Sequence, residues 1–201
     1  MERILQGDCL DILPNFESES IDLIYLDPPF FTNTIQKLKT RDGSKEFSYS
    51  DIWKSHEEYA EFLYKRLKEL KRVLKSDGSI FVHCDKNSTH IVKTLLDDIF
   101  GLKQFQSEII WYYKRWSNSR KGLLPSHQTI YFYSKTKDFK FKTIYNDYSE
   151  TTNIDQILQR RVRDKNGKTV YAKDDQGKTI NSDVKKGVPL NDVWEIPYLN
   201  P

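Results

Sequence analysis

The segment Ile21–Leu26 (IDLIYL) is an almost continuous apolar run that ends abruptly at Asp27-Pro28-Pro29-Phe30. A run of this length is typical of a strand that is buried on both faces of a parallel sheet. The strand must stop at the prolines, because proline has no N–H to donate to a sheet ladder. The pattern therefore predicts a buried strand whose carboxyl end presents an aspartate.

Strand and helix patterns alternate through the first 135 residues. Ser55, with Glu58 three residues later, forms a capping box, and apolar residues at helical spacing follow it until Ser76-Asp77-Gly78 ends the run. The predicted elements are strand 3–6, helical turns 9–15, strand 21–26, helix 55–75, strand 79–83, helix 88–100, and strands 108–113 and 129–133. This order predicts an α/β fold, a three-layer sandwich with a mostly parallel sheet and an antiparallel pair at one edge.

Two stretches depart from this alternation. Residues 31–54 contain few aliphatic side chains and predict a long loop, a feature that in compact domains is usually functional or mobile. After Lys140 apolar residues become sparse, and Asn166-Gly167 predicts a hairpin with a type I′ turn. We therefore expect a core at residues 1–140 and an irregular, hairpin-containing appendage at residues 141–190.

The composition limits the expected location and partner of the protein more than it limits the expected function. The net charge of +3 and the 13% aromatic content suit a folded domain and are compatible with a nucleic-acid partner. No apolar run is long enough to span a membrane, and the acidic N-terminus does not resemble a secretory signal. Cys9 and Cys84 have neither metal-site spacing nor a disulfide framework, so a cytoplasmic location is expected.

The Asp27-Pro28 pair has the geometry to hold an amino group. In open α/β sheets ligands bind at the carboxyl ends of the strands, and the two residues before and at a proline have restricted backbones. The carboxylate of Asp27 and the carbonyl of Pro28 are thus two acceptors in a fixed relation, which match the two hydrogens of a nucleobase NH₂. The plainer alternative is a turn that merely ends a strand.

Several sequence blocks, in order, resemble the β-class amino-methyltransferases that modify DNA. The blocks are Gly7–Leu10 (GDCL), Ile21–Phe30 (IDLIYLDPPF), Lys71–Lys75, Gly78–Asp85, Glu108–Trp111, Thr129–Lys135 and Asp192–Pro201. The resemblance covers most of the chain. It implies a Rossmann-like S-adenosylmethionine methyltransferase fold in permuted order, with residues 1–140 as catalytic core and 141–201 as target-recognition region and connector.

The same resemblance implies the roles of the site residues. Asp27, Pro28, Pro29 and Phe30 are the implied catalytic residues, and Phe30 offers a flat face for stacking an extruded base, worth ~1–3 kcal/mol. Because the reference pKa of an aspartate is about 4, the carboxylate would position the amine rather than deprotonate it beforehand. Asp8 and Cys9 are the implied contacts to the adenine of S-adenosylmethionine; their alternatives are a helix N-cap and a plain buried thiol.

The glycine-rich segment that holds the methyl donor in this family is not found in the sequence. None of the eight glycines lies two residues from another, so there is no G-x-G. In the family this segment comes after the target-recognition region and adds two strands in mid-sheet, so their absence predicts an incomplete sheet with a gap of roughly 14 Å. We expect the chain alone to be inactive and to need the rest of a longer chain or a second chain.

Basic residues near aromatic ones suggest where DNA would bind. Candidates lie in the loop between the last two core strands and at the predicted hairpin: Lys114, Arg115, Trp116, Arg120, Lys121, Arg160, Arg161 and Arg163. For any one of them, a solvated basic face is the alternative. His83-Cys84-Asp85 predicts strand-end packing rather than a metal site, because neighbours on a strand point to opposite faces.

The resemblance predicts a restriction–modification or regulatory methyltransferase acting on double-stranded DNA. Adenine-N6 is favoured over cytosine-N4, because aspartate rather than serine opens the D-P-P-F block. A non-catalytic DNA-binding fragment is a second hypothesis, and methylation of RNA or of protein glutamine, where the block begins with asparagine, is a third. The sequence does not distinguish a monomer from a homodimer.

Overall fold

The computed structural model describes residues 2–114, 121–148, 158–181 and 187–197. The chain forms two compact units, Met1–Phe141 with Asp192–Pro201, and Lys142–Asn191. The second unit covers nearly the same residues as the appendage expected at 141–190, and residues 192–197 belong to the first unit. They return to the first unit because β11 (Val193–Glu195) pairs in parallel with a core strand.

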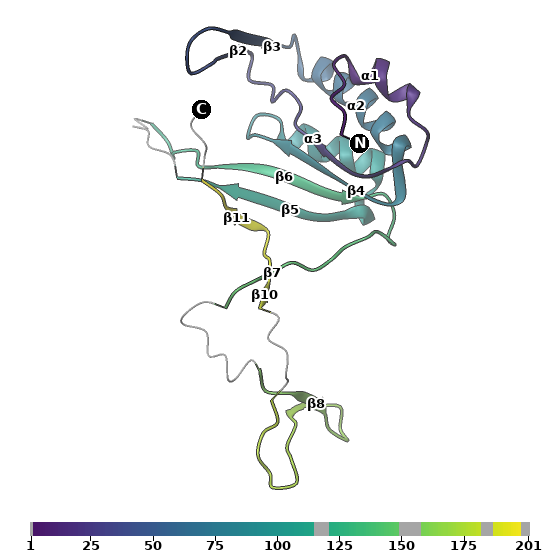
Figure 1. The fold of residues 1–201 in the computed structure, drawn as a ribbon, viewed down its shortest axis with the longest axis vertical. Helices are drawn as coiled ribbons and strands as arrows, with labels where there is room; N and C mark the ends of the chain where they lie inside the picture. Colours follow the sequence, from purple (N-terminus) through teal and green to yellow (C-terminus); the bar gives the residue numbers. More distant parts are fainter. Residues whose placement is uncertain (1, 115–120, 149–157, 182–186, 198–201) are drawn as a thin grey trace. The chain divides into compact units, whose positions relative to one another are not determined.

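The first unit is built on one five-stranded sheet with strand order β1-β4-β6-β5-β11 (Figure 1). The other four strands of this sheet are β1 (Ile21–Leu26), β4 (Leu74–Cys84), β5 (Phe105–Tyr112) and β6 (His127–Ser134). Only β6 runs against its neighbours, since β1 pairs with β4 and β5 with β11 in parallel. The mostly parallel α/β sheet is confirmed, and so is the antiparallel β5–β6 pair, which β11 separates from the sheet edge.

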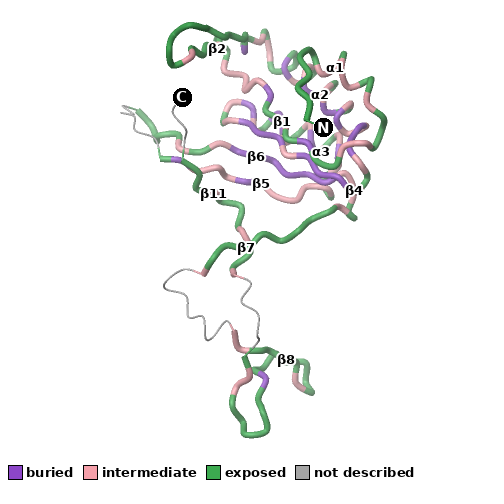
Figure 2. Tube along the Cα trace, in the orientation of Figure 1, coloured by how far each residue is buried: buried purple, intermediate pink, exposed green. Residues whose placement is uncertain are grey.

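Helices cover one face of this sheet. The helices are α1 (Cys9–Ile12), α2 (His56–Val73) and α3 (Thr89–Phe100), with 3-10 turns at Leu13–Asn15 and Leu102–Gln104. The backbone N–H of Glu58 donates to Ser55 Oγ at 3.3 Å, which confirms the predicted cap of α2. The α2 and α3 side chains share one buried core with alternate residues of β4 and β6, including Val82 and Tyr133 (Figure 2).

The opposite face of the sheet has a different cover. Its cluster consists of Ile109, Ile130 and Phe132, with Phe81, Phe139 and Trp194 packed around them. None of these residues is helical, so in the described ranges helices form a layer on only one side. No helix in those ranges is long and apolar enough to cross a membrane.

Three local predictions for the first unit are wrong. Residues 3–6 form no strand, and Ile4 is 99% exposed, because no described strand lies beside them to complete a ladder. β1 is an edge strand rather than a doubly buried one, and no core cluster of the described residues covers its face away from the helices, which leaves Leu23 60% and Tyr25 54% exposed. Residues 31–54 are not a plain loop but contain the hairpin β2 (Thr34–Lys39) and β3 (Glu46–Asp51).

The second unit consists of short strands and tight turns. β7 (Tyr145–Asn146) pairs with β10 (Val188–Pro189), and β8 (Arg161–Arg163) pairs with β9 (Thr169–Tyr171). The predicted hairpin around Asn166-Gly167 is therefore confirmed, although its turn is not type I′, because only Gly167 has positive φ. The Asp164 carboxylate holds this turn by accepting from the N–H groups of Asn166 and Lys168, each at 2.9 Å.

Candidate active site

The Asp27 turn, residues 27–32, leaves β1 at its carboxyl end. The Asp27 side chain is 60% exposed, Pro28 is buried, and Pro29 and Phe30 are half-buried. The aspartate therefore does not pack inward, and the residues after it anchor the turn in the protein. An exposed carboxylate on a buried support is suited to meeting a ligand from solution.

Two contacts from later in the chain hold the Asp27 turn. The Tyr59 hydroxyl on α2 donates to the Pro29 carbonyl at 2.6 Å. The backbone of Phe31 has φ of 62°, a conformation that costs energy for a non-glycine residue. Buried Asp51 stabilises it by accepting from the N–H groups of Phe31 and Thr32, at 3.1 and 2.8 Å.

Asp51 is ionised in this setting. Burial acts to raise the pKa of its carboxyl group, but hydrogen bonds from Thr32, Trp53 and Phe31 outweigh burial and hold the pKa below its usual value. The Trp53 indole contributes one of these bonds, from Nε1 to Asp51 Oδ1 at 2.8 Å. The end of β3 thus fixes the turn that carries Asp27.

His83 lies directly beside Asp27. The β1–β4 register pairs Leu26 with Val82, which places the next residue of each strand side by side. Nδ1 of His83 is 3.2 Å from Asp27 Oδ1, and its Nε2 is 3.0 Å from Oε1 of Gln128. His83 packs at the end of its strand, as the sequence suggested, and it also lies against Asp27.

Aromatic rings enclose the same imidazole. Ring centroids of Phe30, Trp111 and Tyr25 lie 5.1, 5.4 and 6.3 Å from that of His83. His83 is only 6% exposed as a result. No group of three His, Cys, Asp or Glu side chains in the described residues is arranged to hold a metal ion.

The Asp27 turn offers two outward acceptors. One Asp27 oxygen faces His83, and the other has no hydrogen bond from the described part of the chain. Within the same ranges, no group donates to the Pro28 carbonyl, whereas the Pro29 carbonyl is taken by Tyr59. A planar NH₂ group has two donors that could engage this carboxylate oxygen and this carbonyl.

Asp8 and Cys9 lie at the start of α1. Asp8 is the predicted N-cap, with Oδ1 accepting from Leu10 N at 2.9 Å, and its Oδ2 forms an ion pair with Arg66 at 2.6 Å. The Leu10 hydrogen bond and the Arg66 charge lower the pKa of Asp8. Cys9 is half-buried, and burial raises the pKa of its thiol. No hydrogen bond or ion pair between described residues joins this pair to the Asp27 turn.

The predicted DNA contacts are only partly described. Arg115, Trp116 and Arg120 lie outside the described residues. In the first unit Lys114 and Lys121 are exposed, and Lys114 Nζ lies 3.6 Å from Glu195 Oε1.

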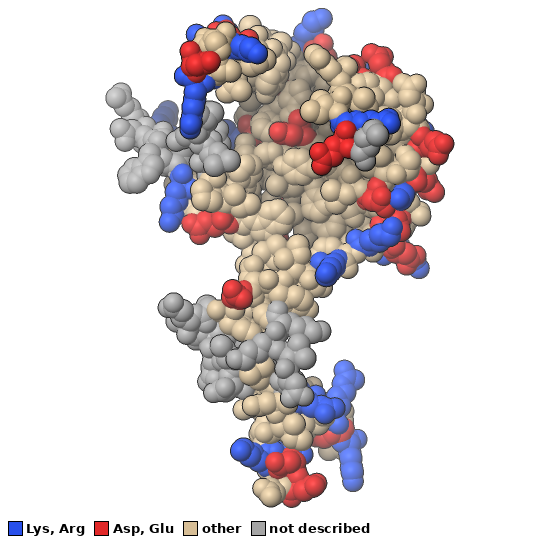
Figure 3. All heavy atoms as spheres, in the orientation of Figure 1, with Lys and Arg blue, Asp and Glu red and all other residues tan. Residues whose placement is uncertain are grey.

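The hairpin arginines belong to the second unit. All three candidates there, Arg160, Arg161 and Arg163, are exposed. The Arg161 guanidinium lies 5.6 Å from the centre of the Tyr171 ring. Basic and acidic side chains are interspersed on this unit, so its surface is not uniformly basic (Figure 3).

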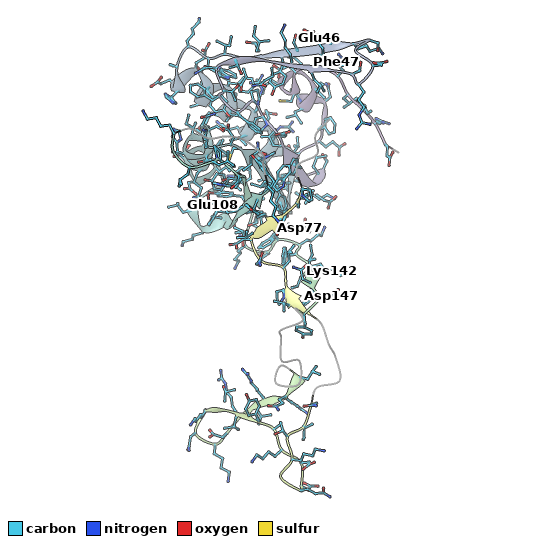
Figure 4. All side chains as sticks on the ribbon, turned by 90° about the vertical axis from the view of Figure 1, so that its left-hand side faces the viewer. Glu46, Phe47, Asp77, Glu108, Lys142 and Asp147 are labelled. Atoms are coloured by element: carbon cyan, nitrogen blue, oxygen red, sulfur yellow. The ribbon has the colours of Figure 1, made fainter. Side chains whose placement is uncertain are left out.

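The β2–β3 hairpin is a surface that the sequence did not reveal. The hairpin exposes Leu38, Phe47 and Tyr49, and the strand register places these three side chains on one face. Glu46 and Phe47, at the turn end of β3, are labelled in Figure 4. Burial raises the pKa of Tyr49, and the carboxylates of Asp51 and Asp27 add to this rise, so the hairpin lies near the Asp27 turn. The alternation of Phe47 and Tyr49 with serines in β3, after the turn residues Asp42-Gly43, was the one signal that could have predicted it.

The chain is an α/β protein whose candidate ligand site lies at the carboxyl ends of two parallel strands, β1 and β4. A family model described as DNA methylase, of the N6/N4 methyltransferases, matches residues 21–201. The chain therefore belongs to the N6/N4 DNA methylase family. The matched range contains both the Asp27 turn and β11.

Individual relatives agree with this assignment. The type II methyltransferase M.HinfI of Haemophilus influenzae is 30% identical over 167 residues, which are 80% of this chain and 45% of that protein. The EcoP15I Mod subunit of Escherichia coli, a type III restriction-modification enzyme, is 24% identical over 75% of this chain and 27% of its own length. The chain thus spans less than half the length of these relatives.

Solved structures give a similar match. The PvuII DNA methyltransferase, named as cytosine-N4-specific, is 24% identical with a TM-score of 0.46, over 66% of this chain and 48% of that one. A DNA modification methylase of Thermus thermophilus, solved in complex with S-adenosyl-L-methionine, is 15% identical with a TM-score of 0.46, over 68% of this chain and 54% of that one.

Proposed function

We propose that this chain is the catalytic and target-reading part of a DNA amino-methyltransferase that methylates the exocyclic amine of a flipped base. The observation that carries this proposal is the Asp27 turn, whose exposed carboxylate and open Pro28 carbonyl lie on a support fixed by Asp51 and Tyr59. Adenine-N6 is the favoured target because aspartate opens the turn, and cytosine-N4 is the alternative. The setting is a cytoplasmic restriction–modification or regulatory system.

The chemistry follows from these acceptors. When both hydrogens of the amine are accepted, the nitrogen lone pair turns out of conjugation with the base and becomes available as a nucleophile. Asp27 and Pro28 orient the amine, and Phe30 provides a stacking face beside it. The amine proton leaves during or after transfer, because a carboxylate is too weak a base to remove it from a neutral amine.

S-adenosylmethionine is the proposed methyl donor, and when bound it supplies an electrophilic methyl group. The residues present fit only one side of a donor site. Asp8 is exposed and could accept from the donor's adenine amine with its remaining lone pairs, with Cys9 beside it. There is no glycine turn to receive the rest of the molecule, since the sequence contains no G-x-G.

We therefore propose that a polypeptide segment outside these 201 residues completes the sheet and the donor site. Exposed Leu23 and Tyr25 on the edge strand β1 support this proposal. So does a cavity of about 820 Å³, which is lined by Arg3, Leu5, Gln6, Ile12, Asn15, Phe16, Glu17 and Ser20. The family resemblance places two further strands between the segment that ends at Asp8 and the strand that ends at Asp27.

The completing segment can be tested by adding it. The chain alone should bind S-adenosylmethionine weakly by calorimetry and transfer no labelled methyl group. A glycine-rich F-x-G-x-G polypeptide, fused or added in trans, should restore both. Micromolar donor affinity together with turnover by the purified 201 residues would contradict the need for such a segment.

The methyltransferase activity is tested on the completed protein with Asp27→Ala. We expect methyl transfer to duplex DNA to fall about a thousandfold, while DNA affinity changes little. RNA and glutamine peptides serve as comparison substrates. A non-catalytic DNA-binding fragment, the second candidate favoured by the missing G-x-G, predicts DNA binding with no methyl transfer by either protein and no effect of the donor.

For DNA binding we propose the exposed cations Lys114, Lys121, Arg160, Arg161 and Arg163 as phosphate contacts. Arg115, Trp116 and Arg120 belong to the same proposal by sequence. Each phosphate contact that is removed should reduce the salt dependence of binding by about one counterion. Equal salt slopes for wild type and charge-removed variants would contradict these assignments.

A further inference from the structure

The Asp27 carboxylate has two oxygens with different surroundings. Oδ1 lies 3.2 Å from His83 Nδ1, within ion-pair distance of the imidazole. Oδ2 has no donor among the described residues. A carboxylate held by one oxygen presents the other in a defined direction, which is what an acceptor for a single amine hydrogen requires.

His83 itself is held from the opposite side. Its Nε2 is 3.0 Å from the Gln128 side chain on β6, and Phe30 and Trp111 pack around its ring. Trp111 is anchored in turn, because its Nε1 donates to the Ile196 carbonyl at 2.9 Å. The imidazole on β4 is therefore held by Gln128 on β6 and by two packed rings, one of which is anchored to the residue that follows β11.

The charge of Asp27 selects which nitrogen carries a proton. A neutral ring protonated only on Nε2 would point the Nδ1 lone pair at a carboxylate oxygen 3.2 Å away, which is repulsive. Two forms avoid this repulsion. In the imidazolium both nitrogens carry a proton, and in the neutral form with a proton only on Nδ1 the Gln128 amide must turn so that its NH₂ group, in place of Oε1, faces Nε2. In either form the protonated Nδ1 faces Asp27 Oδ1 at 3.2 Å.

We propose that His83 is a positioning residue for methyl transfer, which holds Asp27 Oδ1 so that Oδ2 and the Pro28 carbonyl face the base amine. This inference rests on the proposed methyltransferase function and adds a residue to it. His83 does not reach the base. It acts through Asp27, and Gln128 acts through His83.

Two substitutions separate the hydrogen bond from the ring. His83→Asn keeps an N–H donor close to the place of Nδ1 but removes the aromatic contacts. His83→Phe keeps a ring among Phe30 and Trp111 but removes both nitrogens. In the completed enzyme, His83→Phe should lower kcat about tenfold to a hundredfold with KM for DNA and donor within twofold, and His83→Asn should recover most of the loss.

The kinetic measurements distinguish a failure of the positioning role of His83 from a failure of the proposed methyltransferase function. Full kcat in His83→Phe, an equal loss in both variants, or a change confined to KM would overturn the positioning role while leaving the methyltransferase function in place. A wild-type enzyme that methylates no nucleic acid would instead remove the proposed function, and the positioning role with it.

A spectroscopic measurement tests the contact without activity. Two-bond ¹H–¹⁵N spectra of the 201-residue chain should show His83 with a proton on Nδ1, and Asp27→Ala should change the ¹⁵N shift of that nitrogen. His90, which is exposed and far from Asp27 in sequence, is the internal control. An unchanged His83 signal in Asp27→Ala, or a ring protonated only on Nε2, would contradict the inference.

Discussion

Two turns of this molecule are each held by an aspartate carboxylate, but the two aspartates come from very different places in the chain. The turn between β8 and β9 is held by Asp164, which accepts from N–H groups two and four residues away. The Asp27 turn is held by Asp51, which is 20 residues from Phe31 and 19 from Thr32. The first turn is a property of a short segment, whereas the second forms only after the β2–β3 hairpin has closed.

Burial adds a second difference. Asp51 is fully buried, and Asp164 is partly exposed. Loss of a buried acceptor leaves its donors without water, at a cost of about 1–3 kcal/mol for each unsatisfied group. Loss of an exposed acceptor lets water replace it. The turn that carries chemistry is therefore the one that depends most on distant packing.

Asp51→Ala should have the largest effect. The substitution leaves the N–H groups of Phe31 and Thr32 and the Trp53 indole without their acceptor. We expect the free energy of unfolding to fall by about 3 kcal/mol or more, measured by urea denaturation, and methyl transfer by the completed enzyme to be lost. If Asp51→Ala lowered the free energy of unfolding by less than Asp164→Ala does, the comparison between the buried and the exposed aspartate would be wrong.

Low pH should remove part of the stabilisation that the Asp51 carboxylate provides. The lowered folded-state pKa of Asp51 means that its stabilisation is fully present above the ordinary value of 3.8 and is lost as the pH falls through the lowered value. The wild type should therefore lose stability below about pH 4 more steeply than Asp51→Asn, in denaturation measured at a series of pH values. Parallel profiles for the two proteins would contradict this.

Tyr59→Phe should have a smaller effect on the Asp27 turn. It removes only the hydroxyl that donates to the Pro29 carbonyl and keeps the ring against Phe31 and Trp53. We expect about 1 kcal/mol of destabilisation and faster amide exchange in residues 30–32. Tyr64→Phe, on the same helix and half-exposed, is the matched control and should change neither.

Asp164→Ala should have the smallest effect. Its two donors, Asn166 N and Lys168 N, are exposed and can turn to water. We expect a change of about 0.5 kcal/mol or less and faster exchange only near residues 164–168. If amide exchange in the Asp27 turn also became faster in this variant, Asp164 would not be a purely local anchor and the comparison would be wrong.

Local patterns predicted the elements whose causes are local. The Ser55 cap, the apolar spacing of α2 and the Asn166-Gly167 hairpin all appear where the sequence indicated them. The end of β1 at Asp27-Pro28 was also predicted, because proline stops a ladder wherever it stands. The Asp8 N-cap belongs to the same group.

Contacts between distant segments were not predictable in the same way. Leu23 and Tyr25 are exposed because of the place that β1 takes in the sheet. The residues of one strand do not specify the order of the strands. The β2–β3 hairpin was missed because its strands carry mixed side chains and bury only their end at Asp51.

The amino-acid sequence by itself determined the type and approximate place of the core helices and strands and which residue opens the site, because caps, prolines and apolar spacing act over a few residues. Only the tertiary structure decided how Asp27 is held. His83 lies beside Asp27, Gln128 holds His83, and Asp51 holds the turn that follows Asp27. These three residues come from three other strands, and they are brought together by strand pairing and register, which depend on contacts between distant segments.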